Sequence, residues 1–594
     1  MENREVARIL RETAQLLEID GAPIGRFRSY EKAAELLDNL SDRVEELARN
    51  GEKLTELPGI GEGLAEHIRE ILGTGDYSLR RKLLKKYPET ILDLLDLQSL
   101  GPKKVALIWK KFHAATVEDV ARLAREGKLR DVPGFGEKSE QNILRAAETF
   151  KKAAGRFLIH DADETAQALV AHIEKLGKKI GAVEPAGSLR RRKETIGDLD
   201  LLLTLASRRS KETVEEITEH ILAFPSIEQI LARGENKISF RLESGMQVDV
   251  RLLEAKHRGA ALMYFTGSKE HNVALRSRAN KMGYTLNEYA LATLEDEKPV
   301  ASTTETEIYK KLGLAFIEPE LRENTGEIEA AAKGTLPKLI ELGDIRGDLQ
   351  MHTVASDGKN TIEEMALAAK QLEHEYIAIT EHSKAVTVAN GLDEKRTLEQ
   401  IRLIHEADKK IEGIHLLAGS EVDILKNGKL DLDDEVLAQL DVVVVSIHSF
   451  MNLDPVAMTE RILAAIENPY TQIIAHPTGR LLLRREAFTF DMEKVLDAAK
   501  KHNVAMECNA YPDRLDLNDV HLRMAKERGV KITISTDSHS TKNLSYIKYG
   551  VSMARRGWIE RSDVLNALPY EQFRKKLRAK PGAKPLRHPR RKSA

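Results

Sequence analysis

Two aspartates separated by one residue, Asp198 and Asp200, open an apolar run in the segment PAGSLRRRKETIGDLDLLL (185–203). Because a strand alternates its faces with a period of two residues, both carboxylates point to the same side. Two negative charges on one face repel each other unless a cation lies between them. A third aspartate, Asp249, lies in the strand-like run MQVDVRLL. Three carboxylates on neighbouring strands can hold two divalent ions for in-line phosphoryl transfer, so we interpret these aspartates as catalytic and metal-binding.

The residues just upstream of the paired aspartates favour a phosphate-containing substrate. Gly187 and Ser188 form a turn whose backbone N–H and hydroxyl groups could hold a triphosphate, and Arg190 and Arg191 offer guanidinium groups for the same phosphates. The alternative is a set of strand-end carboxylates that pair with nearby arginines. The upstream turn and the third aspartate favour the catalytic interpretation.

A second group of metal-ligand residue types lies in the carboxyl-terminal half. Histidines and carboxylates recur in DLQMHTVASDG (348–358), Glu381-His382, Glu421, His448, His476 and Asp537-Ser538-His539. Several of them end separate apolar runs, and the strands of an α/β barrel would gather them at one end. Imidazoles mixed with carboxylates suit Zn²⁺, Mn²⁺ or Fe²⁺ better than Mg²⁺ or Ca²⁺. A lone histidine is more often an ordinary core or surface residue, and we interpret His374, His405 and His502 in that way.

The first 150 residues are predicted to be helical, with three related turns before helices: LPGIGEGLAEHI, LQSLGPKKVALIW and DVPGFGEKSEQNI. Glycine lets the backbone approach a phosphate, and a helix N-terminus offers unpaired N–H groups. Such contacts carry no base information. We therefore expect sequence-independent DNA binding at the residues of these turns, namely Gly59, Gly61, Gly101, Lys103, Gly134 and Gly136. The alternative for any single turn is a plain helix start.

The rest of the chain divides by its pattern. Residues 157–250 and 254–314 mix strand and helix signals, and a polar stretch near 320–333 is typical of a linker. From 343 to 568, short β-rich runs such as YIAIT and DVVVVSIH alternate with helical ones, which predicts an α/β barrel-like domain. The basic tail from Arg574 is either a disordered solubilising end or a weak phosphate attractor.

Bulk composition excludes several classes of protein. The 594 residues carry a net charge of −2, so any nucleic-acid surface must be local. No stretch approaches the ~20 apolar residues that cross a bilayer, and the amino terminus lacks a signal-peptide core. The single cysteine, Cys508, fits a reducing compartment. We expect a cytoplasmic protein without a membrane partner.

The segments YFTGSKEHNVALR (264–276) and GYTLNEY (283–289), together with the paired aspartates, resemble family X DNA polymerases. The resemblance implies a palm with Mg²⁺ or Mn²⁺, and gapped or primed DNA and dNTPs as partners. It places Tyr264, Phe265 and Gly267 beside the incoming sugar. Asn272 would reach the minor-groove edge of the base and Arg276 the template side. The implied dNTP-binding set is Gly187, Ser188, Arg191, Tyr264, Phe265, Gly267, Asn272 and Arg276.

One departure from that family concerns lyase activity. The position of the Schiff-base lysine is His67, and another lysine of the relatives becomes Gly63. Histidine cannot supply the primary amine that forms an imine, so lyase activity by that route is not expected. Arg26 and Tyr30 could still bind a 5′-phosphate at a gap.

The carboxyl-terminal pattern resembles the polymerase and histidinol phosphatase (PHP) domain, a multi-metal phosphoesterase. The resemblance implies a Zn²⁺ or Mn²⁺ cluster held by His352, Asp357, His382, Glu421, His448, His476, Asp537 and His539. Imidazole must be neutral to bind metal. The activity of this domain should therefore fall as the pH drops below the pKa range of histidine, near ~6.5. Gln350 and Asp357 stand where histidines are common, and Gln350 offers only a neutral oxygen. Occupancy of one metal position therefore depends on Gln350.

The two resemblances together predict a multidomain chain: a helical helix-hairpin-helix region, an α+β nucleotidyltransferase palm with a thumb, and an α/β distorted-barrel PHP domain. The expected domains are a lyase-like domain (1–85), fingers (86–153), palm (154–254), thumb (255–318), linker (319–342), PHP domain (343–570) and basic tail (571–594). We expect a monomeric repair polymerase with 3′-end processing. The alternatives are a PHP nuclease with a vestigial palm and a non-enzymatic DNA-binding scaffold.

Overall fold

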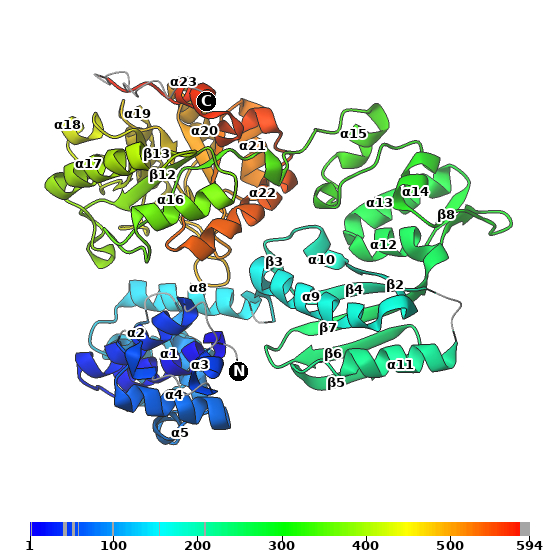
Figure 1. Ribbon diagram of the computed structural model, residues 1–594, viewed down its shortest axis with the longest axis horizontal. Helices are drawn as coiled ribbons and strands as arrows, with labels where there is room; N and C mark the ends of the chain where they lie inside the picture. Colours follow the sequence, from blue (N-terminus) through cyan, green and yellow to red (C-terminus); the bar gives the residue numbers. More distant parts are fainter. Residues whose placement is uncertain are drawn as a thin grey trace. The chain divides into compact units, whose positions relative to one another are not determined.

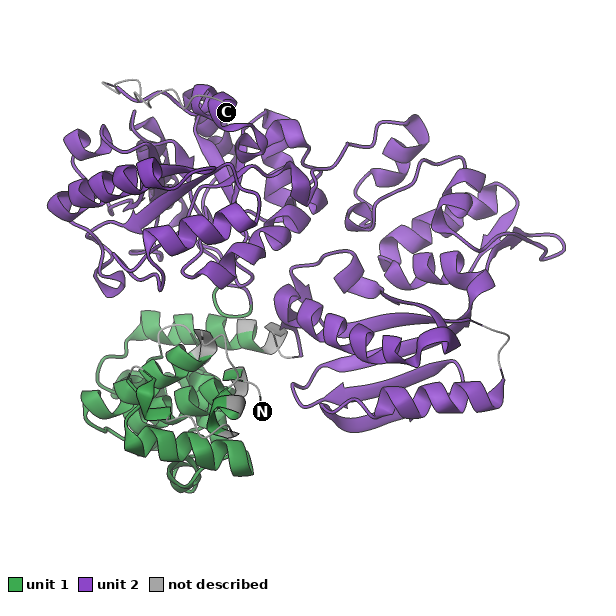
Figure 2. Ribbon diagram, viewed as in Figure 1, with its two compact units in different colours: residues 1–154, 483–485 green, residues 155–482, 486–594 purple. Residues whose placement is uncertain are grey.

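The amino-terminal part of the chain is helical, as its sequence predicts. The computed structural model describes residues 1, 3–39, 44–49, 54–57, 59–97, 100–153, 155–206 and 210–581. The chain forms two compact units, residues 1–154 with 483–485 and residues 155–482 with 486–594 (Figure 2). The helices of the first unit (Figure 1) are α1 (Asn3–Ile19), α2 (Ile24–Asn39), α3 (Val44–Arg49), α4 (Glu62–Thr74), α5 (Ser78–Leu84), α6 (Pro102–Phe112), α7 (Val117–Arg125) and α8 (Glu137–Ala153).

Each of the three repeated turns leads into a helix of this unit. Helix α4 follows Gly61, α6 follows Gly101 and α8 follows Gly136. Gly59 and Gly134 have φ angles of +82° and +84°, which favour glycine because it lacks a Cβ. Residues 58, 98 and 99 of the repeats lie outside the described part. One hydrophobic cluster contains buried side chains from all eight of these helices, so the expected domains 1–85 and 86–153 share a core.

The palm of the second unit is a five-stranded sheet in the order β2-β4-β7-β6-β5. Its strands are β2 (Ile180–Pro185), β4 (Asp198–Leu205), β7 (Gln247–Glu254), β6 (Lys237–Leu242) and β5 (Ile227–Arg233). The central β4 and β7 are parallel, whereas the other pairs are antiparallel. Helices α9 (Ile159–Ile173) and α11 (Lys211–Leu222) bury their apolar faces with the sheet's inner side chains. The expected strands of 199–205 and 246–253 are confirmed.

A smaller layer follows the palm. It contains α12 (Arg258–Thr266), α13 (Lys269–Lys281), α14 (Glu305–Lys311) and an antiparallel sheet of β8 (Tyr284–Leu286), β9 (Leu291–Thr293) and β10 (Pro299–Ala301). The expectation of a loose linker over 319–342 is wrong, because this segment carries α15 (Glu327–Lys333) and packs against the thumb core. Arg322 and Glu327 are fully buried there, and they pair with Glu305 and His271.

The carboxyl-terminal domain is a parallel barrel whose seven strands follow chain order. They are β11 (Gly347–Asp348), β12 (Tyr376–His382), β13 (His415–Asp423), β14 (Val442–Ser446), β15 (Ile473–Ile474), β16 (Ala505–Asn509) and β17 (Ile532–Ser535). A parallel bridge between Met351 and Ser538, and a bond from the Thr536 N–H to Asp348, nearly close it. The main intervening helices are α16 (Ile362–Gln371), α17 (Glu394–Lys410), α19 (Pro455–Glu467), α20 (Met492–His502), α21 (Asp519–Arg528) and α22 (Ile547–Arg556).

The first residues of the basic tail are part of this barrel. Phe573 of α23 (Tyr570–Lys576) is fully buried in a cluster with side chains of β12 to β16, including Tyr376 and Val444. Arg578 donates to the carbonyls of Ile466 and Thr471 at 3.0 and 2.9 Å. The tail up to residue 581 is therefore held by packing, which does not fit the first of its two interpretations, a disordered solubilising end. Residues 582–594 lie outside the described part. Within the described residues, none of the helices is long and apolar enough to cross a membrane.

Candidate active sites

The three predicted palm aspartates come together at one end of the β4–β7 pair. Asp200 stands directly opposite Asp249 in the parallel register, and Asp198 lies two residues earlier on the same face. The intervening Leu199 and the following Leu201 are fully buried on the other face. One oxygen from each carboxylate lies within 4.8 Å of the other two. The alternation seen in the sequence thus produces a group that could hold divalent cations.

The charges of this group are poorly balanced by the protein alone. Burial raises the pKa of Asp200 to about 6, and the neighbouring charge of Asp198 adds to the effect. Lys237 Nζ lies 2.5 Å from Asp249 Oδ2, an ion pair that the sequence gave no reason to expect. A divalent cation would relieve the remaining repulsion, and three carboxylates are an all-oxygen donor set.

Gly187 allows the aspartates and the upstream turn to approach each other. Its φ is +56°, and a Cβ built at this position would lie 2.5 Å from Asp200 Oδ2. The Ala186 N–H also donates to the Asp200 carbonyl at 2.9 Å. Glycine at this position therefore suits both the backbone conformation and the small space beside the Asp200 carboxylate.

A cleft of about 390 Å³ lies against these aspartates. Its lining contains Asp198, Asp200 and every member of the predicted nucleotide set, namely Gly187, Ser188, Arg191, Tyr264, Phe265, Gly267, Asn272 and Arg276. Thr266 and Lys269 also line it and were not predicted. Within the lining, Asn272 Nδ2 donates to the Tyr264 carbonyl at 2.7 Å, and the Arg251 guanidinium lies 4.0 Å from the Phe265 ring centroid. The structure thus brings together residues that are about 90 positions apart in the chain.

Arg190 does not have the expected phosphate-binding position. Its guanidinium makes two bonds to Glu305, at 2.9 and 2.6 Å, and one to the Thr266 hydroxyl. Burial raises the pKa of Glu305, but its hydrogen bond to Arg190 and the charges of Arg322 and Arg190 outweigh this and lower it to about 2. Arg190 therefore holds the palm to the thumb, and Arg191 is the arginine that faces the cleft.

The predicted DNA-binding residues of the first unit differ in exposure. Arg26 and Lys103 are exposed, as are Gly59, Gly61, Gly101, Gly134 and Gly136. Tyr30 is buried, and its hydroxyl lies 3.1 Å from His67 Nδ1. Burial lowers the pKa of His67. Of this set, Tyr30 packs in the core beside His67, whereas the Arg26 side chain is exposed to solvent, where it could meet an anion.

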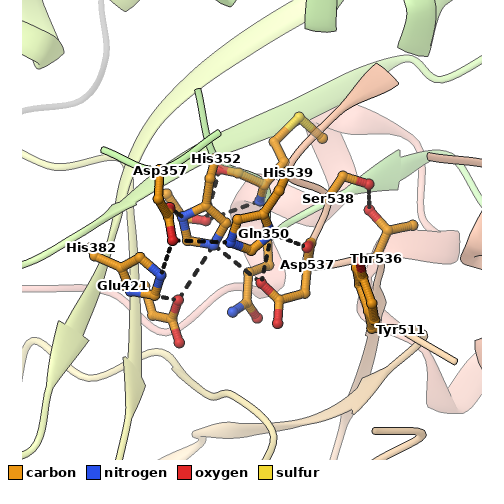
Figure 3. A network of polar contacts seen from close by, with 12 residues as sticks. Gln350, His352, Asp357, His382, Glu421, Tyr511, Thr536, Asp537, Ser538 and His539 are labelled. Atoms are coloured by element: carbon orange, nitrogen blue, oxygen red, sulfur yellow. Dashed lines mark hydrogen bonds and ion pairs between the residues drawn. The ribbon is translucent and has the colours of Figure 1, made fainter. Parts of the chain in front are cut away.

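The predicted ligands of the second site lie at or beyond the carboxyl ends of the barrel strands, and Figure 3 shows six of them, His352, Asp357, His382, Glu421, Asp537 and His539. All of the eight except His476 form three overlapping groups, in each of which one ligand atom per residue lies within 4.8 Å of the others. The groups are His352, Asp357, His382 and His539; His382, Glu421 and His448; and His352, Glu421 and Asp537. Residues shared between groups are typical of a cluster in which neighbouring ions have common ligands.

Glu421 lies at the centre of this cluster. Its Oε1 is 2.8 Å from His476 Nε2 and 3.4 Å from His448 Nε2, and its Oε2 is 3.3 Å from His382 Nδ1 and 3.4 Å from His352 Nε2. The carboxylate is fully buried at the end of β13. Burial raises its pKa, but the histidines around it outweigh that effect and hold the pKa well below its usual range.

Several buried polar atoms of the cluster lack a hydrogen-bond partner among the described residues. They are His352 Nδ1, His382 Nδ1, Glu421 Oε2, His476 Nδ1 and both Gln350 side-chain polar atoms. Unpaired buried donors and acceptors are costly, and metal ions would pair several of them. Gln350 is fully buried among the ligand side chains (Figure 3). The donor set therefore fits a metal cluster, with the amide oxygen of Gln350 as an additional neutral donor.

Two carboxylates near the cluster were missed from the sequence. Asp423, two residues after Glu421 on β13, accepts from the His448 backbone N–H at 2.9 Å and lies 3.2 Å from His448 Nδ1. Glu507 on β16 accepts from the His476 N–H at 2.8 Å. The contact of Asp423 with Nδ1 is of the kind that fixes the ring orientation of a metal-binding histidine, whereas Glu507 holds the backbone of His476. The sequence signal that could have identified Asp423 and Glu507 was their position near the carboxyl ends of predicted strands, which they share with the ligands.

The comparisons with known proteins cover both halves of the chain. Models of a Helix-hairpin-helix domain and of a SAM-like Helix-hairpin-helix tandem match residues 1–77 and 91–149. The DNA polymerase beta thumb model matches residues 261–323, and the PHP domain model matches residues 348–510.

Individual relatives agree with these matches. A Bacillus subtilis (strain 168) protein named "DNA polymerase/3′-5′ exonuclease PolX" is 37% identical over 569 residues, which cover 96% of this chain and 98% of that protein. A "Probable phosphatase" of Thermoanaerobacter sp. (strain X514) is 30% identical over 37% of this chain and 89% of its own length. A "Probable phosphatase" of Acetivibrio thermocellus is 32% identical over 32% of this chain and 78% of its own length.

Proposed function

Because this chain belongs to the family X DNA polymerases that carry a PHP domain, we propose that it fills short gaps in damaged DNA and processes 3′ ends. The observation that carries the proposal is the cleft in which Asp198 and Asp200 meet all eight predicted nucleotide-binding residues. A vestigial palm has no reason to keep this constellation, so the alternatives of a PHP nuclease with an inert palm and of a DNA-binding scaffold are disfavoured.

In the palm reaction, the primer 3′-hydroxyl attacks the α-phosphate of a dNTP and pyrophosphate leaves. Asp198, Asp200 and Asp249 would hold Mg²⁺ or Mn²⁺ on all-oxygen ligands, and Lys237 orients Asp249. Arg191 and the Gly187–Ser188 turn would bind the triphosphate. The bound ions would supply electrostatic stabilisation of the attacking and leaving oxygens.

In the second reaction, water hydrolyses a phosphoester bond at a DNA 3′ end. His352, Asp357, His382, Glu421, His448, His476, Asp537 and His539 would hold Zn²⁺ or Mn²⁺, ions that suit mixed imidazole and carboxylate donors. Asp423 orients the ring of His448, and Glu507 holds the backbone of His476. The substrate is proposed to be the 3′-terminal phosphodiester, in keeping with the exonuclease named for the Bacillus subtilis relative.

From the sequence and the packing we also propose the domain boundaries, the binding partners, the oligomeric state and the cellular compartment. The domain division at residues 85, 153, 254, 318 and 342 follows the expected boundaries, with 319–342 now assigned to the packed edge of the thumb. Gapped DNA and dNTPs are the proposed partners of a monomer. The single cysteine supports a reducing, cytoplasmic compartment.

A 5′-labelled primer on gapped DNA tests the two activities together. The protein is incubated with and without dNTPs under Mg²⁺, Mn²⁺ or Zn²⁺. Extension with dNTPs and shortening without them are expected. Shortening alone would support a PHP nuclease with a vestigial palm, and binding without either reaction would support a scaffold.

Gly187→Ala should lower dNTP incorporation by about 100-fold or more. The new Cβ would lie against Asp200 Oδ2, and alanine also disfavours the φ of +56°. Single-nucleotide incorporation on gapped DNA measures the loss. Gly245→Ala is the matched control, because Gly245 has a φ of +85° and no atom within 4 Å of its Cβ position. Equal losses in the two variants would contradict a role for the space beside Asp200.

The protein should bind gapped DNA more tightly when the downstream strand carries a 5′-phosphate. The exposed Arg26 near His67 and the first hairpin motivates this expectation. Arg26→Gln should reduce the preference severalfold, since charge-assisted contacts to phosphate are strong. Fluorescence anisotropy at fixed salt measures it, because phosphate contacts are screened by ions. Equal affinity for both DNAs in the unaltered protein would count against this role.

The metal concentration that half-saturates 3′ processing should fall as the pH rises towards about 9. Burial lowers the pKa of His352, but Asp537, Glu421 and Asp357 outweigh it and raise the pKa to about 9. A metal must therefore displace a proton from this ring below that pH, so apparent metal affinity increases with pH. For this ring, the pH range over which protons compete with metal therefore lies higher than the reference range near ~6.5. Activity titrated with Mn²⁺ at pH 6.5, 7.5 and 8.5 checks it, and an unchanged half-saturating concentration would contradict it.

A further inference from the structure

The proposed triphosphate-binding arginine is held in place by two neighbours. Arg191 Nη1 donates to the Thr266 carbonyl at the end of α12. Its Nε donates to Glu323 Oε1 at 3.1 Å. An arginine side chain has many rotamers, so these two contacts decide where its guanidinium points.

The same oxygen of Glu323 binds a second arginine, which comes from the PHP domain. Arg556, the last residue of α22, donates from Nη1 to Glu323 Oε1 at 3.0 Å and to the Arg191 carbonyl at 2.8 Å. Its Nη2 lies 2.5 Å from Asp519 Oδ2 at the start of α21. Arg556 thus contacts both the backbone of Arg191 and the carboxylate that holds its side chain.

Arg556 is only 5% exposed, so these contacts are shielded from solvent. Burial raises the pKa of Glu323, but the charges of Arg556, Arg191 and Lys193 outweigh it and keep the pKa below its usual range. Because Glu323 is shared, it cannot turn fully towards Arg191 and neutralise it. Without Arg556 the carboxylate would be free to pair more closely with Arg191 and to draw it from the cleft.

We propose that Arg556 is a positioning residue that acts through Glu323 to aim Arg191 at the triphosphate of the incoming nucleotide. Helix α22 of the PHP domain is then part of the polymerase's nucleotide site, in addition to its place in the barrel. The inference rests on the proposed function, specifically on the role of Arg191 in binding dNTPs.

Steady-state incorporation of one dNTP on gapped DNA tests the proposal in the full-length protein. Arg556→Gln should raise the KM for dNTP by about tenfold, the cost of a charged hydrogen bond, with a smaller change in kcat. The 3′ processing rate should remain within about twofold of the unaltered protein, since no metal ligand changes.

Arg555→Gln is the matched control. Arg555 precedes Arg556 on α22 and also joins the PHP domain to the thumb, but it bonds to Glu320 at 2.7 Å and to the Ile340 carbonyl. It should leave the KM for dNTP unchanged. If Arg555→Gln and Arg556→Gln raise KM equally, a general loosening of the two domains explains the effect and the proposal is wrong. Thermal unfolding of both variants confirms that they are folded.

Two further variants separate the inference from the proposed function. Arg191→Gln should raise the KM more than Arg556→Gln does. If Arg191→Gln leaves KM unchanged, the proposed role of Arg191 fails; if it raises KM while Arg556→Gln does not, the inference alone fails. The double variant Glu323→Gln/Arg556→Gln should be no worse than the poorer single variant, because both act through one contact. Additive losses would overturn the route through Glu323.

Discussion

Asp249→Asn should lower dNTP incorporation by about 100- to 1,000-fold while 3′ processing continues, since loss of one preorganised electrostatic group costs about 10²–10³ in rate. Asparagine keeps the size of the side chain at this buried position but removes the charge that faces Asp200 and pairs with Lys237. Single-turnover incorporation on gapped DNA measures the first activity. Shortening of a 5′-labelled primer without dNTPs measures the second.

Glu184→Gln is the control for this substitution. Glu184 lies on β2, which neighbours β4 in the same sheet, and its carboxylate pairs with Arg258 at 2.5 Å outside the aspartate group. It should retain incorporation within severalfold. If Asp249→Asn abolishes both reactions in a folded protein, the two activities share one site and the proposal of separate centres fails.

The sequence was sufficient to predict that the three palm aspartates lie together, because the signals for this grouping are local. The two-residue spacing of Asp198 and Asp200 determines their shared face, and the strand character of 246–253 predicts the partner of that strand. The contact between Asp200 and Gly187 follows from the antiparallel pairing of β2 with β4, because Gly187 begins the short helix α10 (Gly187–Arg190) that directly follows β2. Lys237 was not predictable, because its approach to Asp249 depends on the register of β6 against β7.

The errors arose where distant residues decide the outcome. Arg190 and Arg191 are adjacent and chemically alike, yet Glu305 removes the first from the phosphate site. The polar composition near 320–333 is typical of an exposed linker and gives no sign that Arg322 is buried. Its charge is compensated by that same Glu305. Likewise, the basic tail has no hydrophobic periodicity that would predict the packing of Phe573 against the barrel strands. In each case the pairing partner lies far along the chain or in another layer.

The pKa values of the histidines at the second site depart from the reference value for a related reason. A reference pKa near ~6.5 describes an isolated imidazole. In the cluster, His352 faces three carboxylates, whereas burial lowers the pKa of His382 to about 3. Two histidines of one cluster thus shift in opposite directions, because the balance between burial and neighbouring charge differs between their positions.

Glu421→Gln should reduce 3′ processing by more than about 100-fold, because even the loss of an outer partner of a metal ligand costs about 10- to 100-fold. Glu421 faces four histidines and belongs to two of the three ligand groups, so its charge is shared by most of the cluster. The variant should also retain less Mn²⁺ or Zn²⁺ after dialysis, as measured by inductively coupled plasma mass spectrometry. Gap filling should survive, since the palm carboxylates are unchanged.

Asp441→Asn provides the matched control for that substitution. Asp441 is also a buried carboxylate beside a histidine, at 2.9 Å from His405 Nε2, but it precedes β14 and so lies at the amino ends of the strands. It should keep both the bound metal and 3′ processing within severalfold. Equal loss of metal in the two variants would attribute the effect to a weakened barrel. If Glu421→Gln keeps the metal and the activity of the unaltered protein, the carboxylate is not a ligand, and the imidazoles around it serve the fold instead of hydrolysis.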